Sequence, residues 1–128
     1  MIAQLKTFKG NALAIEAIES FTETDVKLVH KFFEEKRAQG HEHINVLVKL
    51  DELKINQINT KKFMEHIVWV FRNLDHIGNI AIVAHSNILK ALIPIDNFFF
   101  ERLKKGYEER YFDRSHIEKA FLFIAPNE

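Results

Sequence analysis

The sequence predicts one mixed α/β domain that spans residues 1–128. Two short strand patterns at its start are joined by a tight turn, which indicates an antiparallel hairpin. Two later runs rich in β-branched residues have the composition of strands buried on both faces. Segments with helical spacing alternate with these runs, which indicates parallel strands with helical crossovers. We therefore expect a mixed sheet of about five strands, an N-terminal antiparallel hairpin and then parallel β-α units, with about four helices.

The hairpin is predicted from a period of two residues. Residues Ile2–Phe8 and Ala12–Ile18 alternate between two faces, as strands do. The tripeptide Lys9-Gly10-Asn11 between them has the composition of a turn. Two strands joined this closely are expected to pair antiparallel.

A first helix is predicted after the hairpin. Thr22 or Thr24 is suited to the N-cap position. Lys36 and Arg37 fall in the last turn, where the helix dipole favours cations, and Gly40 is placed to end the helix. A wide apolar face is formed by Val26, Leu28, Val29, Phe32 and Phe33.

The two buried strands are predicted at Ile44–Leu50 and Asn79–Ala84. A second helix between them begins at Thr60 and carries apolar rows at helical spacing. Ser86 is suited to cap a third helix, which Pro94 must end or kink because proline lacks an amide hydrogen.

The last third of the chain predicts a short helical piece, an edge strand and a final helix. Asp96 is suited to begin the helical piece, and Tyr107–Phe112 alternates aromatic and charged residues, as edge strands do. The pattern Ser115-His116-Ile117-Glu118 matches a capping box before the last helix.

The composition excludes several classes of function. Eighteen basic residues balance eighteen acidic ones, so the basic excess typical of nucleic-acid binding is missing. There is no cysteine, which removes disulfides and thiol catalysis. We expect no signal peptide, no transmembrane segment and a cytoplasmic location. No glycine-rich phosphate loop is present, and we expect no cofactor.

Three polar groups in the sequence are candidates for a chemical site. His85-Ser86 follows a buried strand, where open α/β sheets place ligands, but the G-x-S-x-G pattern of hydrolases is missing. His41-Glu42-His43 would put two imidazoles on one face of a strand, without a third metal ligand nearby in sequence. Asp51-Glu52 would face opposite ways on a strand. We therefore assign no catalytic residue and no metal ligand.

The Phe98-Phe99-Phe100 triplet is unusual in a helix. Three consecutive helical residues fan out over about 200° of the circumference, so they cannot all enter one core. Three arrangements are compatible with this pattern: a helix wedged between the sheet and a neighbouring element, a lip over an apolar pocket, or a contact between subunits. The residues of this pocket or interface are Ile88, Leu92, Ile95, Phe98, Phe99 and Phe100.

The chain resembles the SpoIIAA-like proteins, small bacterial domains of STAS/Sec14-like architecture. The likeness rests on the opening hairpin, on Thr24-Asp25 at the start of the first helix, and on two further segments. These are Asn79-Ile80-Ala81-Ile82-Val83 and Glu109-Arg110-Tyr111-Phe112-Asp113, each followed by a helix. The resemblance covers about residues Ile2 to Phe123 and implies a mixed sheet without catalytic residues.

The resemblance also implies two modes of action. Anti-sigma-factor antagonists of similar shape carry a phosphorylated serine in an Asp-Ser-Ser-Gly-like motif after the third strand. The corresponding residues 51–60 lack this motif, and Thr60 supplies the hydroxyl nearest to that place. Thr60 and Ser86 are therefore the candidate phosphorylation or anion sites. Sec14-like domains carry lipids, which by analogy of fold favours a pocket under the Phe-rich segment.

Three functions follow from these observations. The first is a non-catalytic regulatory module that binds a protein partner and forms a homodimer. The alternative is a small carrier of a lipid or another apolar ligand, held in a pocket roofed by the third helix. The last is an enzyme that uses the strand ends at Asp51 and His85. The first is favoured because no catalytic constellation is present and aromatic residues are abundant.

Overall fold

The computed structural model describes residues 1–18, 22–50, 76–86 and 108–128, together with the single residues 66, 70, 74 and 89. Five strands lie in these residues: β1 (Ile2–Lys6), β2 (Ala12–Ala17), β3 (Ile44–Lys49), β4 (Ile77–Ala84) and β5 (Glu109–Asp113). The helices are α1 (Glu23–Ala38), the 3₁₀ turn η1 (Arg114–His116) and α4 (Ile117–Ile124).

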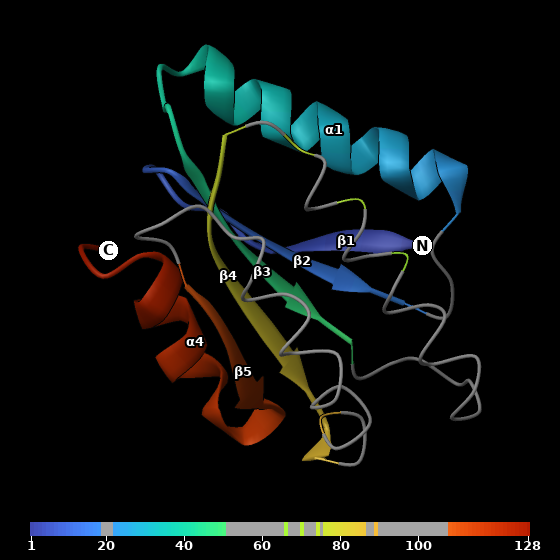
Figure 1. Ribbon diagram of the computed structural model, residues 1–128, viewed down its shortest axis with the longest axis vertical. Helices are drawn as coiled ribbons and strands as arrows, with labels where there is room; N and C mark the ends of the chain where they lie inside the picture. Colours follow the sequence, from blue (N-terminus) through green and yellow to red (C-terminus); the bar gives the residue numbers. More distant parts are fainter. Residues whose placement is uncertain are drawn as a thin grey trace.

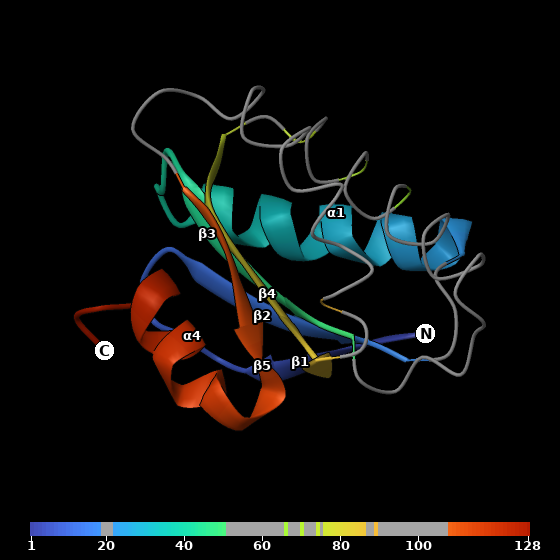
Figure 2. The same ribbon diagram turned by 60° about the horizontal axis from the view of Figure 1, so that its bottom comes forward.

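The strands form one mixed sheet in the order β1-β2-β3-β4-β5. β1 pairs antiparallel with β2, and every later neighbour pair is parallel. Helix α1 covers one face of this sheet, and α4 covers the opposite face, where it packs against β3, β4 and β5 (Figures 1 and 2). The predicted fold class, a hairpin followed by parallel strands, is therefore confirmed, and β5 is an edge strand as expected.

The number of helices differs from the expectation of about four. The part of the chain that the structure describes contains two α-helices, α1 and α4. The helix expected to begin at Asp96 lies outside the described residues, as does most of the one expected from Ser86. Most of the helix expected from Thr60 also lies outside them, and the described residues His66 and Val70 within it are helical.

Helix α1 begins where its capping residues dictate. The Thr22 side chain accepts a hydrogen bond from the Asp25 amide, and the Asp25 carboxylate accepts one from the Thr22 amide, which completes a capping box. The sequence left Thr22 and Thr24 open as caps, and the structure selects Thr22. The helix is followed by Gly40, whose φ of 97° lies in the region that favours glycine.

Alternation along the central strands divides the apolar side chains into two cores. The core under α1 contains Val29 and Phe33 of the helix and every second residue of the strands, including Leu13, Ile15, Val46, Val48, Ile80 and Ile82. The core under α4 takes the intervening residues, including Ala14, Leu47, Ala81 and Val83. Both faces of the sheet are therefore buried, as the near-continuous apolar runs indicate.

The face under α4 is built from small side chains. Ala12, Ala14 and Ala81 lie on it and are almost fully buried, and Ala120 of the helix packs against this cluster. Beyond the helix, Glu16 of β2 and Lys49 of β3 are opposite each other in register and form an ion pair of 2.9 Å. Small residues thus let a short helix sit close to the sheet, and a cross-strand ion pair continues the same face.

The start of α4 differs from the predicted capping box. The carboxylate of Asp113 accepts hydrogen bonds from the amide of Ser115 (3.0 Å) and from its hydroxyl (2.6 Å), so Asp113 caps the 3₁₀ turn η1. Helix α4 then begins after His116, which makes no side-chain capping bond. The prediction that Ser115 caps the last helix was wrong, because Asp113 binds the Ser115 amide, which Glu118 would bind in a capping box, and the 3₁₀ turn delays the start of the helix.

Stability is expected to depend on pH through Asp25. Burial opposes ionisation of this carboxyl, but hydrogen bonds from Thr22 and the charge of the Met1 amino group outweigh it and hold the pKa below the ordinary 3.8. A carboxyl with a lowered pKa in the folded state stabilises the fold above its unfolded pKa, and this contribution is lost as the pH falls through the folded value. Urea unfolding measures the free energy of unfolding above and below pH 3.8. This free energy should fall less at low pH in Asp25→Asn than in the parent. Equal losses in the two proteins would contradict this assignment.

Candidate functional site

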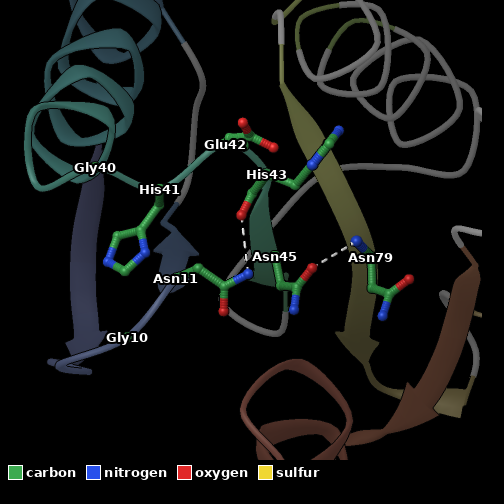
Figure 3. A pocket seen from close by; sticks show the side chains of 8 residues that line it. All are labelled: Gly10, Asn11, Gly40, His41, Glu42, His43, Asn45 and Asn79. Atoms are coloured by element: carbon green, nitrogen blue, oxygen red, sulfur yellow. Dashed lines mark hydrogen bonds between the residues drawn. The ribbon is translucent and has the colours of Figure 1, made fainter.

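A polar pocket of about 550 Å³ lies at the edge of the sheet where the parallel strands begin (Figure 3). Its residues come from the segments that lead into three neighbouring strands. The lining residues are Gly10, Asn11, Gly40, His41, Glu42, His43, Asn45 and Asn79. Parallel strands all start at the same edge of the sheet, so residues at the starts of these strands lie together although they are distant in sequence. The sequence reasoning expected ligands at the opposite edge.

Three asparagines connect the strand starts across this edge. Asn11 Nδ2 donates to the carbonyl of His43 at 2.8 Å. Asn45 accepts from the Asn79 amide at 2.8 Å and donates to the carbonyl of Ile124 in α4 at 3.0 Å. Asn79 Oδ1 accepts from the Glu108 amide at 2.9 Å. Each side chain thus satisfies backbone groups of the next segment, and we call these residues the edge asparagines.

Gly78 is required by the edge asparagines. A Cβ atom at this position would lie 2.3 Å from Asn45 Oδ1, far inside contact distance. The absent side chain therefore lets Asn45 reach the amide of Asn79. The sequence showed Gly78 only as a turn residue, and the structure places it inside β4.

The histidines of the pocket do not form the metal pair that their spacing suggested. That interpretation needs His41 and His43 on a strand, but β3 begins at Ile44. The two rings point away from each other in Figure 3, and the ring of His43 lies 6.5 Å from that of His76. Among the described residues, no group of three or more potential ligand side chains could hold a metal ion. The pocket instead offers imidazole, amide and carboxylate groups for hydrogen bonding to a polar molecule.

The sequence-predicted site residues lie mostly outside the described residues. This applies to Thr60 and to the apolar set Ile88, Leu92, Ile95, Phe98, Phe99 and Phe100, which remain predictions. Ser86 is described and is exposed. The amide of Leu89 donates to the carbonyl of His85 at 3.0 Å, and Ser86 and Leu89 are both helical.

Ser86 lies next to a polar cluster at the carboxyl ends of β4 and β5. Asp113 is paired in register with Ala84, which places it beside His85. The two hydrogen bonds from Ser115 hold the pKa of the Asp113 carboxyl below its ordinary value, and the charges of His85 and His116 act in the same direction. The cluster therefore favours a carboxylate at this edge.

Two charged residues near the amino edge were missed by the sequence reasoning. Lys36 is 6% exposed, and its ammonium donates to the carbonyls of Phe8 and Gly10. Burial lowers the pKa of Lys36, and the charge of Glu128 partly offsets this effect. A signal was present, because Lys36 follows Phe33 by three residues and therefore lies on the buried face of α1. From the sequence, Lys36 was placed in the last turn of the helix, and its burial was not predicted.

A family model described as SpoIIAA-like matches residues 12–125. The chain belongs to the SpoIIAA-like family. The match extends from the start of β2 to the end of α4 and confirms the resemblance found in the sequence. No curated protein and no solved structure matched the chain. Within the described residues, no helix has the length and apolar character needed to cross a membrane.

A double-mutant cycle should show that Gly78 and Asn45 act together. In the parent, Gly78→Ala should destabilise by about 1–3 kcal/mol because the new Cβ displaces the Asn45 amide. In an Asn45→Ala background the same substitution meets no amide, and its cost should fall to near zero. Urea unfolding of the four proteins measures the coupling. If Gly78→Ala lowers the free energy of unfolding equally in the two backgrounds, the close approach of residue 78 to Asn45 does not contribute to stability.

Proposed function

We propose that this SpoIIAA-like domain is a non-catalytic regulatory module that acts by binding a protein partner. The match of the family model over residues 12–125 carries the proposal, since domains of this family usually serve regulatory protein interactions and are generally non-catalytic. The proposal includes a cytoplasmic location and a homodimer.

The carboxyl edge of the sheet is the proposed contact surface. Ser86 is exposed there, beside His85 and the Asp113 cluster. A phosphate on this hydroxyl would add negative charge next to an existing carboxylate and would change how the edge meets a partner. Thr60 is the second proposed switch residue, from its place after the third predicted strand.

A charge at residue 86 should alter the affinity for the partner. The partner is first captured by cross-linking and identified, and its Kd for the purified domain is then measured by calorimetry. Ser86→Asp should change that Kd by roughly tenfold, as expected for a charge change at a contact, whereas Ser86→Ala should leave it unchanged. Aspartate also suits a helix N-cap, so the circular dichroism of Ser86→Asp should match that of the parent and show that the charge leaves the fold intact. Equal affinities of the two variants would exclude Ser86 as the switch.

Native mass spectrometry separates the interaction module from the apolar carrier. Gently purified protein should give a dimer without additional mass. An extra mass of a few hundred daltons that is lost on denaturation would overturn this expectation and support a lipid carrier. In that case Phe99→Ala should abolish uptake of a fluorescent fatty acid. A monomer at every concentration would contradict the homodimer.

A further inference from the structure

The turn between β1 and β2 holds a carboxylate in a two-pronged contact. The amide of Lys9 donates to Glu128 Oε1 at 2.6 Å, and the amide of Gly10 donates to Glu128 Oε2 at 3.1 Å. Each oxygen of the carboxylate therefore receives one of two consecutive backbone amides. Adjacent amides that converge in this way form a concave site for anions. The Glu128 pKa lies below its ordinary value, chiefly because of the hydrogen bond from Lys9.

A buried ammonium binds the other side of the same turn. Lys36 donates to the carbonyl of Phe8, and the amide hydrogen of that peptide group belongs to Lys9, which donates to Glu128. One peptide unit is thus held between an ammonium at its oxygen and a carboxylate at its nitrogen. A cation at the oxygen polarises the peptide and strengthens its amide as a donor. Lys36 is therefore placed to strengthen the Lys9 amide as a donor to an anion.

The space around the turn can admit another carboxylate. A pocket of about 390 Å³ is lined by Lys9, Gly10, Asn11 and the segment Ala125–Glu128. Pro126, Asn127 and Glu128 are exposed, so this segment can leave the turn without uncovering either core. A Cβ atom at Gly10 would lie 3.1 Å from Glu128 Oε2, which shows how closely the carboxylate approaches the backbone.

We propose that the Lys9–Gly10 turn, backed by Lys36, is a binding site for carboxylates, which Glu128 occupies within the chain and which an external carboxylate occupies when Glu128 leaves. The ligand is a compact, planar anion with two oxygens, matched to the two amides. The proposal concerns the amino edge of the sheet and holds whether or not the carboxyl edge binds a protein.

Nuclear magnetic resonance of the Glu128→Ala protein tests the site directly. Acetate is the probe, and chloride at equal ionic strength and acetamide, which has the same shape without the charge, are the controls. Acetate should move the amide resonances of Lys9 and Gly10 along one saturating curve, and the controls should not. The parent protein should need roughly tenfold more acetate for the same shift, because its own carboxylate competes.

The role of Lys36 is tested in the same Glu128→Ala background. Adding Lys36→Met should weaken acetate binding by roughly tenfold, because the polarising charge is lost. Adding Lys31→Met, which removes an exposed lysine from the same helix, should leave it unchanged. The titration of Glu128→Ala alone decides the proposal if Lys36→Met fails to fold. Three results would overturn the proposed carboxylate site: shifts of the Lys9 and Gly10 amides that do not saturate with acetate, the same shifts with acetamide, or equal shifts in the parent and in Glu128→Ala.

Discussion

The structure depends on how the unpaired backbone groups at the amino edge of the sheet are satisfied. Strands β2 to β5 all begin there. The segments that precede them carry backbone amides and carbonyls that need hydrogen-bond partners beyond those of the paired strands. The edge asparagines bind those groups between neighbouring segments, and Lys36 binds the carbonyls of the β1–β2 turn. Polar side chains at this edge therefore connect the hairpin, the parallel strands and both helices into one unit.

Local pattern was sufficient to predict the strands, their directions and the first helix. Alternation and β-branched composition are properties of neighbouring residues, and they determine which face of a strand is buried. The edge asparagines and the Lys36 contact were not predictable in this way, because their partners are distant in sequence: Asn45 binds a carbonyl 79 positions away. Ser115 shows that a local motif can also mislead: the capping-box pattern was present, but the Ser115 amide donates to Asp113, which lies outside that pattern. Sequence reasoning also looked for a site at the carboxyl edge, where Ser86 and His85 lie, and so missed the pocket at the other end.

The two faces of the sheet are packed with side chains of different size. Large side chains under α1 fill the space below a long helix, whereas the alanines under α4 let a helix of eight residues lie close to the strands. The aromatic residues of α4, Phe121 and Phe123, are partly buried at the rim of the core under α4, and cations lie over their rings. Lys6 lies over the rings of Phe121 and the neighbouring Phe8, and Arg110 lies over that of Phe123. These stacked cations shield apolar rings from water while the surface stays charged.

The bond from Asn45 to Ile124 has a consequence for the order of folding. The strands are neighbours in space in the order in which they occur along the chain, so each can join the growing sheet beside its predecessor. Helix α4 is different, because it is fixed by a side chain of β3 that is simultaneously bound to β4. Closing so long a loop is entropically costly until β3 and β4 are already aligned. Helix α4 is thus expected to dock late, and a nascent chain would keep the alanine face of its sheet open until α4 itself has been synthesised.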